Sequence, residues 1–173
     1  WTLKAGERWH GFGNLAEGFN ILDPIKATII TPGLNMDGDF AEHTGIPAAI
    51  VTKYLAEHGI IVEKCGLYSF FIMFTIGITK GRWNTLLTAL QQFKDDYDRN
   101  QPMWRILPEF CQKHRRYEKM GLRDLCQYVH EMYAKYDIAR LTTDMYLGEL
   151  QPAMTPTDAF AQIARKNTDR VAI

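Results

Sequence analysis

The feature that most constrains the fold is an apolar run over residues 68–76, followed closely by the start of a long helical pattern. An apolar run of this length without alternation is typical of a β-strand buried on both faces. Thr79 is a suitable N-terminal cap for the helix that follows. The apolar stripe of that helix is Trp83, Leu86, Leu87, Leu90, Phe93 and Tyr97. A buried strand joined to an amphipathic helix indicates helices layered on a sheet.

The segments upstream of this run extend the same pattern. Residues 26–31 form a β-rich stretch that Pro32 and Gly33 end, and residues 60–65 alternate like a second strand. Between them lies a helical pattern with Pro47 in its first turn and Gly59 at its end. The order strand, helix, strand, strand, helix predicts an α/β domain, with α+β character, over residues 1–100.

The pattern becomes mainly helical after residue 100. Helices are expected at residues 105–114, 122–136 and 157–166, the last with a cap at Thr155. The dipeptide at 101–102, Gln-Pro, is the expected domain boundary. The second domain would therefore span residues 101–173.

The beginning of the chain indicates a piece of a longer protein. Residue 1 is not a methionine, and the first 22 residues carry four glycines and aromatic side chains without a clear period. These aromatic residues are Trp1, Trp9, Phe12 and Phe19. We expect this segment to lie irregularly over a surface that missing chain supplies.

Composition narrows the partners. The chain has 20 basic and 20 acidic side chains, whereas a dedicated nucleic-acid-binding protein needs a basic surplus, so no nucleic-acid partner is expected. The longest apolar stretch, residues 70–74, is far too short to cross a bilayer, so no membrane partner is expected. The three cysteines cannot all pair, which favours a reducing, cytoplasmic location.

Four patterns that could carry chemistry are each incomplete. Cys111 and His114 have the spacing of metal ligands but lack a second pair, so no metal site is expected. Residues 35–42 resemble a calcium loop with the glycine misplaced, which favours a polar turn. Lys80 lacks the glycine spacing of a phosphate loop. The basic cluster at residues 114–119 could bind an anion, although a solvated face offset by nearby acids is the simpler interpretation.

Glu63 and Cys65 share one face of the alternating segment at residues 60–65. Cys65 is expected to be a small buried hydrophobic residue, because no histidine base lies beside it. A carboxylate at Glu63 would be costly to bury without a cationic partner. Glu63 is therefore either half of a strand-end ion pair or the acceptor for a cationic group of a ligand.

Several phrases of the sequence resemble bacterial ornithine/lysine/arginine decarboxylases, which are fold-type-I enzymes that use pyridoxal phosphate. The phrases are LDPIKATIITPG at 22–33, GIPAA at 45–49, GIIVEK at 59–64 and FTIGITK at 74–80. The similarity continues through LP at 107–108, LRDLC at 122–126 and MTP at 154–156. It spans most of the chain and is specific to the family, although not to one substrate.

The resemblance implies that residues 1–100 are an aminotransferase-like small domain and that residues 101–173 begin the C-terminal domain. It places the Schiff-base lysine and the pyridoxal-phosphate-binding domain upstream of Trp1, so this chain alone is expected to be inactive. Neither Lys64 nor Lys80 lies in the family's Ser-X-His-Lys setting. The family's active sites form at dimer interfaces, which implies a homo-oligomer built from dimers.

The resemblance also gives Glu63 a role. The Glu of the family's Val-Glu-Lys phrase reaches the distal cationic group of the substrate, and a basic amino acid ends in a group that needs such an acceptor. The phrase continues here as KCGLY rather than KTGPY, and lysine, arginine and ornithine all stay open as substrates. The stretches KDDY at 94–97 and QPM at 101–103 lack the arginines that bind the alarmone ppGpp in some lysine-specific members, so that form of inhibition is not expected. A non-catalytic assembly or regulatory module, or an anion-binding surface, are the alternative functions.

Overall fold

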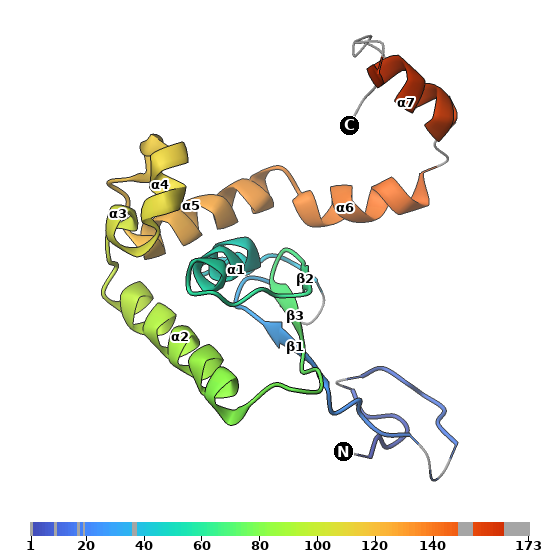
Figure 1. Cartoon of the computed structure of the whole chain (residues 1–173). Helices are drawn as coiled ribbons and strands as arrows, with labels where there is room; N and C mark the ends of the chain where they lie inside the picture. Colours follow the sequence, from blue (N-terminus) through green and yellow to red (C-terminus); the bar gives the residue numbers. More distant parts are fainter. Residues whose placement is uncertain are drawn as a thin grey trace. The chain divides into compact units, whose positions relative to one another are not determined.

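The computed structural model describes residues 2–8, 10–16, 18, 20–35, 38–148 and 154–164. The chain divides into two compact units, Trp1–Asp137 and Ile138–Ile173. Figure 1 gives the order of the elements along the chain. The N-terminal residues Trp1, Trp9 and Phe19, which were expected to cover a surface, lie outside the described residues. Phe12 is described and is exposed.

A three-stranded antiparallel sheet forms the centre of the first unit. Strands β1 (Lys26–Ile30), β2 (Lys64–Cys65) and β3 (Ser69–Met73) lie in the order β1-β3-β2. Thr28 pairs with Phe71, and Lys64 pairs with Phe71 from the other side. The strand predicted at residues 26–31 is confirmed as β1. It ends before Pro32, which has no backbone N–H to donate to a sheet.

The central strand β3 is buried on one face only. Phe70 and Ile72 belong to the hydrophobic core, whereas Phe71 and Met73 on the other face are partly exposed. The expectation of burial on both faces is therefore wrong for this strand, because the side chains of its second face are only partly buried. The predicted strand over residues 60–65 is also shorter than expected. Ile60 and Val62 pack against the core without strand pairing.

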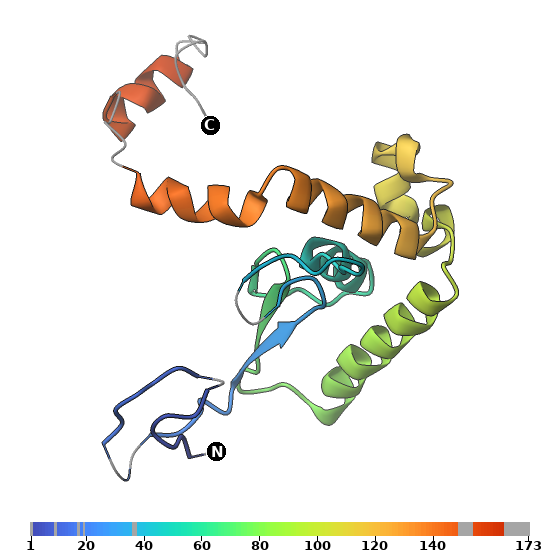
Figure 2. The same ribbon diagram turned by 180° about the vertical axis from the view of Figure 1, so that it is seen from behind.

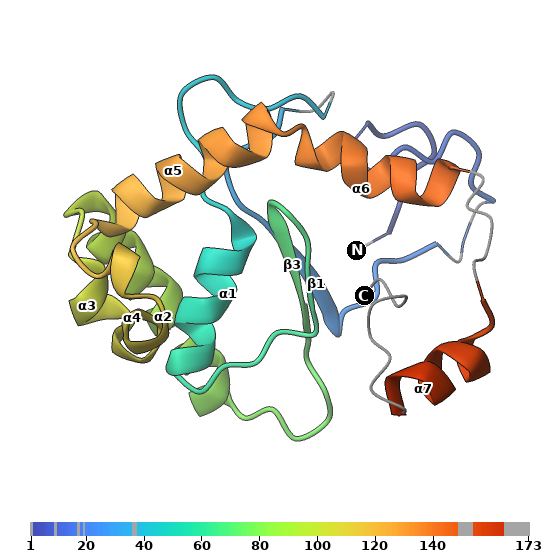
Figure 3. The same ribbon diagram turned by 90° about the horizontal axis from the view of Figure 1, so that it is seen from above.

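Helix α1 (Ala48–Glu57) packs against the sheet, and Figure 3 shows it between the strands and helices α2 to α4. Its core-facing residues, Val51, Tyr54 and Leu55, match the predicted stripe, and Gly59 has the positive φ of +75° expected after a helix end. Helix α2 (Lys80–Asp98) runs as one unbroken helix (Figure 2). The Thr79 side chain accepts a hydrogen bond from the Arg82 backbone N–H, which confirms the predicted cap.

The inward face of α2 is narrower than the predicted stripe. Leu86, Ala89 and Phe93 are buried, whereas Leu87 is exposed. An apolar side chain on a helix does not have to face the core, and the structure selects one side of a wide stripe.

The helical segment after residue 100 begins at a left-handed residue, Asn100, with φ +49°. The helix expected at 105–114 is divided into α3 (Met103–Ile106) and α4 (Pro108–Lys113), followed by a 3-10 turn at Arg115–Tyr117. The break lies at Leu107, because a proline disfavours helical geometry in the residue before it. Helix α5 (Leu122–Lys135) agrees with the predicted helix at 122–136.

Helix α5 lies in the same compact unit as the sheet, so the compact unit extends beyond the predicted domain boundary at residue 100. Within the second unit, α6 (Ile138–Leu147) has no counterpart among the predicted helices. Helix α7 (Pro156–Ala164) matches the prediction at 157–166 as far as the description reaches, and Thr155 Oγ1 accepts the Asp158 backbone N–H at its start. In the described part of the chain, no helix is long and apolar enough to span a membrane.

Candidate functional site

Glu63 lies at a bend immediately before β2, where the chain enters the β2–β3 hairpin. Its backbone N–H donates to the Phe71 carbonyl oxygen at 2.9 Å, which fixes the residue to the central strand. Its side chain is exposed, and within the described residues its carboxylate makes no ion pair or hydrogen bond. The first interpretation of Glu63 was an ion pair with Lys64 or with a residue of a neighbouring helix. The described part of the chain contains no such pair.

The expected burial of the Glu63 face is corrected by the structure. Ile60 and Val62 pack on the core, while Ile61 is 90% exposed. The alternation holds from Ile60 to Val62 but does not continue through the bend at Glu63, because Cys65 lies opposite the core residue Phe70 and Lys64 lies opposite Phe71. A period of two residues separates two faces without identifying which of them meets the core.

Cys65 is exposed, which contradicts the expectation that it is buried. It pairs with Phe70 at the sheet edge, and the Thr52 hydroxyl of α1 lies 3.6 Å from its sulfur. Cys111 and Cys126, in contrast, are buried, and desolvation raises the pKa of the Cys126 thiol to about 12. Burial also raises the pKa of Cys111.

The described lysines do not form a site for pyridoxal phosphate. Lys64 is exposed on the uncovered face of the sheet, and Lys80 is exposed at the start of α2. The shallow depression beside Lys64 is bordered by Thr28, Ser69 and Phe71 and contains no carboxylate to face a pyridine nitrogen. The described residues of this chain therefore do not fit the cofactor.

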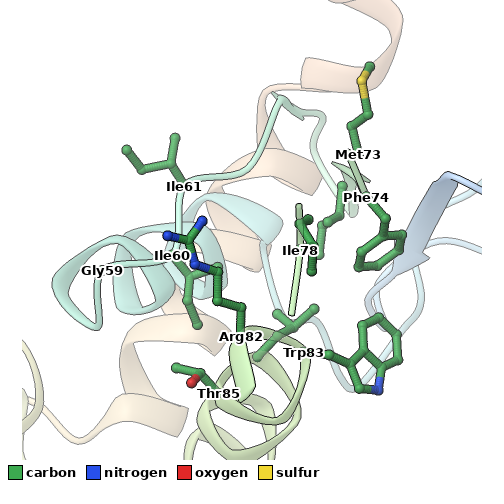
Figure 4. Close-up of a pocket in the computed structure, with 11 residues that line it drawn as sticks. Gly59, Ile60, Ile61, Met73, Phe74, Ile78, Arg82, Trp83 and Thr85 are labelled. Carbon is green, nitrogen blue, oxygen red and sulfur yellow. The ribbon is translucent and has the colours of Figure 1, made fainter. Parts of the chain in front are cut away.

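A groove of about 450 Å³ lies between the end of α1, the end of β3 and the start of α2. Figure 4 shows Ile60, Ile78 and Trp83 around it, with Ile61 pointing away. The Trp83 ring packs edge-on against Phe74 with a centroid distance of 4.8 Å. Arg82 supplies the charge and Thr85 a hydroxyl in a lining that is otherwise mainly apolar. No carboxylate of the described chain lines the groove, so it offers no anionic partner for a cationic substrate.

The basic cluster near residue 115 does not form a simple anion site. Arg116 lies 4.4 Å above the Tyr117 ring, and the His114 ring packs against Phe110. The pocket that contains Arg115 also contains the Glu118 carboxylate, which repels anions. Among the described residues, no group of three or more His, Cys, Asp or Glu side chains is arranged to hold a metal ion.

A buried polar pair that the sequence patterns did not identify joins α5 to the hairpin. The Tyr68 hydroxyl lies 2.6 Å from His130 Nδ1, and His130 Nε2 lies 2.8 Å from the Ala41 carbonyl oxygen. His130 is 2% exposed. A histidine among the apolar positions of α5 is the sequence signal that marks such a pair, because a buried imidazole needs partners for its ring nitrogens.

Comparisons with known proteins agree with these features. The family model "Orn/Lys/Arg decarboxylase, major domain" matches residues 1–82. Lysine decarboxylase LdcA of Pseudomonas aeruginosa is 45% identical over 174 residues, which cover 100% of this chain and 23% of the relative. The biodegradative arginine decarboxylase of Escherichia coli is 34% identical over 174 residues, again covering 100% of this chain and 23% of the relative.

Solved structures give the same result. The constitutive lysine decarboxylase of Escherichia coli aligns with a TM-score of 0.77 at 38% identity, over 96% of this chain and 23% of that protein. Lysine decarboxylase A from Pseudomonas aeruginosa aligns with a TM-score of 0.77 at 45% identity, over 100% of this chain and 23% of that protein. The predicted fold class, a small sheet layered with helices and continued by a mainly helical segment, is confirmed. The chain belongs to the ornithine/lysine/arginine decarboxylase family and spans about a quarter of the length of the relatives that it matches.

Proposed function

We propose that the protein containing this chain is a pyridoxal-phosphate-dependent decarboxylase that converts a basic amino acid to its amine and CO2. The observation that carries the proposal is identity of 45% across the whole chain with a protein named as a lysine decarboxylase. Arginine and ornithine decarboxylases are similar at 34% and 32% identity. Lysine is therefore the first substrate to test, followed by arginine and ornithine.

Within this enzyme, residues 1–100 belong to an aminotransferase-like small domain and residues 101–173 begin a C-terminal domain. The cofactor is held by the preceding part of the polypeptide, where the covalent lysine lies. The full enzyme is a cytoplasmic homo-oligomer built from dimers. The cofactor supplies the electron sink for decarboxylation, and the residues of this chain recognise and orient the substrate.

Glu63 is the proposed substrate-binding residue of this chain. Its carboxylate has no partner among the described side chains, while its backbone is fixed to β3 through Phe71. A free carboxylate on a fixed backbone is suited to receive the ammonium or guanidinium group at the far end of a basic amino acid. The exposed Ile61 nearby is consistent with a surface that the rest of the polypeptide covers. Such cover would also dry the site and strengthen the charge interaction.

The test is the Glu63→Gln substitution in the full-length enzyme. Glutamine keeps the shape and one acceptor oxygen but removes the charge, and a charge-assisted hydrogen bond contributes about 1.5–3 kcal/mol against about 1 kcal/mol for a neutral one. The difference of about 0.5–2 kcal/mol predicts that kcat/KM for the basic substrate falls by about two- to thirtyfold. The absorption spectrum of the bound cofactor should not change, because Glu63 is assigned to the far end of the substrate.

Glu109→Gln is the matched control, since Glu109 is an exposed carboxylate on α4. It should retain the wild-type kcat/KM. If Glu63→Gln retains wild-type kcat/KM on lysine, arginine and ornithine, the site assignment is wrong. If the full-length protein decarboxylates none of the three, the proposed activity itself is wrong. The alternative of a non-catalytic module is tested by sequencing the upstream coding region for the Ser-X-His-Lys phrase.

A further inference from the structure

The position of Glu63 depends on a short hairpin. Strand β2 has two residues and lies at the edge of the sheet, and the turn at residues 66–68 joins it to β3. The Gly66 N–H donates to the Ser69 carbonyl oxygen at 2.8 Å, and the Glu63 N–H donates to the Phe71 carbonyl oxygen at 2.9 Å. These bonds hold Glu63 to the hairpin. A movement of the hairpin would therefore move Glu63 with it.

The turn of this hairpin is anchored from a distant part of the chain. Tyr68 is the last residue of the turn, and its hydroxyl contacts His130 of α5 at 2.6 Å. Its backbone carbonyl accepts the Thr31 N–H at 2.9 Å, and its ring packs edge-on against Tyr133. The side-chain bond thus joins the hairpin to a helix whose sequence lies beyond the predicted domain boundary.

The direction of the hydrogen bonds follows from the chemistry of the partners. The Ala41 carbonyl can only accept, so His130 Nε2 carries the hydrogen in that 2.8 Å contact. In the neutral imidazole, Nδ1 then accepts, and the Tyr68 hydroxyl donates to it. Burial raises the pKa of Tyr68 above its usual value, so the phenol retains the proton that it donates.

Two glycines allow this close approach. A Cβ on Gly33 would lie 2.0 Å from the Tyr68 ring, and a Cβ on Gly45 would lie 2.0 Å from His130 Nδ1. A side chain at either position would therefore displace the ring that it meets. The backbone at Gly33 therefore packs directly against the Tyr68 ring, and the backbone at Gly45 packs directly against the His130 ring.

From this arrangement we propose that Tyr68 and His130 are positioning residues that hold the β2–β3 hairpin so that Glu63 meets the substrate. Helix α5 thereby contributes to the affinity for the basic amino acid, although none of its residues is assigned to contact the substrate. This inference rests on the proposed role of Glu63. The matched substitutions are Tyr68→Phe, which removes one hydroxyl, and Tyr133→Phe, whose hydroxyl makes no hydrogen bond with the described residues.

Hydrogen exchange on the full-length protein tests the structural step without requiring activity. Tyr68→Phe should accelerate exchange of the amides at residues 63–66, because the turn loses its anchor, whereas Tyr133→Phe should leave them at the wild-type rate. Unchanged protection at 63–66 in Tyr68→Phe would overturn the inference. If Tyr68→Phe does not fold, His130→Gln and His130→Ala replace it, since glutamine can donate to Ala41 and accept from Tyr68 whereas alanine can do neither.

Steady-state kinetics tests the functional step. Tyr68→Phe should raise KM for the basic substrate by about three- to tenfold with little change in kcat, and His130→Gln should retain a KM closer to wild type than His130→Ala. In a Glu63→Gln background, Tyr68→Phe should add no further increase, because it acts through the lost carboxylate. An equal increase in both backgrounds would show that the pair does not act through Glu63.

The kinetic results distinguish the substrate-binding role of Glu63 from the positioning role of Tyr68. If Glu63→Gln lowers kcat/KM but Tyr68→Phe leaves KM unchanged, the role of Glu63 stands and the positioning role is wrong. If Glu63→Gln has wild-type kinetics, the substrate assignment is wrong, and a positioning role through Glu63 is wrong with it. In that case faster exchange at residues 63–66 would still assign Tyr68 as the structural anchor of the hairpin.

Discussion

The neighbouring residues Leu86 and Leu87 on α2 allow the same substitution to be made inside and outside the core. Leu86 is 5% exposed and belongs to the hydrophobic core, while Leu87 is 48% exposed. The sequence pattern placed both in one apolar stripe, whereas the structure separates them. Leu86→Ala and Leu87→Ala therefore test the rotation of α2 about its axis.

The expected magnitudes follow from burial. Leucine to alanine removes the equivalent of three methylene groups, each contributing about 0.8 kcal/mol when fully buried. Large-to-small substitutions in cores cost about 2–5 kcal/mol in total, because a cavity remains. Leu86 also borders the groove beside Trp83, where water can enter the vacated space, so a loss of about 2–3 kcal/mol is expected. Leu87→Ala should cost less than about 1 kcal/mol, because about half of that side chain is exposed before unfolding.

Urea unfolding of the 173-residue chain, followed by tryptophan fluorescence, measures both values. The comparison requires equal m-values, since a changed m-value would indicate a changed unfolded or folded ensemble. If Leu86→Ala does not fold, Leu86→Val gives a smaller loss in the same direction. Equal losses for the two alanine variants, or a larger loss at Leu87, would refute the described orientation of α2.

Three further outcomes are expected. A thiol reagent at pH 8 should modify the exposed Cys65 rapidly and the two buried cysteines only after unfolding. Burial raises the pKa of Cys126 to about 12, which suppresses the reactive thiolate. The substitution Cys65→Ser should remove the rapid phase of modification. In urea unfolding, Asn100→Ala should lower stability by about 1–3 kcal/mol and Asn100→Gly by less. Both variants lose the hydrogen bonds that the Asn100 side chain accepts from the start of α5. Only alanine also places a Cβ on a backbone with φ +49°, where it is strained. The chain alone, mixed with pyridoxal phosphate and reduced with borohydride, should give no single stoichiometric lysine adduct by peptide mapping, and one specific adduct with turnover would contradict this.

Elements with a local signal at each end were predictable from the sequence. Strand β1 is followed by a proline, and α2 begins at a threonine cap, so their positions depend on neighbouring residues alone. Helix α6 was missed because only Tyr136 and the left-handed Asp137 separate it from the end of α5, so no glycine or proline marks where one helix ends and the next begins. Its threonine pair at 142–143 also has low helix propensity, which weakens the pattern.

Features that depend on distant partners were not predictable in the same way. The exposure of Glu63 depends on which face of a short segment meets α1 and the core, and alternation alone does not state this. The pair formed by Tyr68 and His130 joins residues separated by 62 positions. The family phrase identified Glu63 as a candidate, but only the folded chain shows that its backbone is fixed and its carboxylate free of described partners.

The order β1-β3-β2 leaves both outer strands of the sheet as open edges in the described part of the chain. The two edges differ in their capacity to recruit other chains, because β2 offers two residues whereas β1 offers five. Strand β1 ends in Ile29 and Ile30, and Ile30 is 78% exposed. An exposed apolar edge of this length is a template for strand addition. When the chain is produced apart from the rest of its protein, self-association should therefore begin along β1, and a lysine at position 30 should raise its solubility limit.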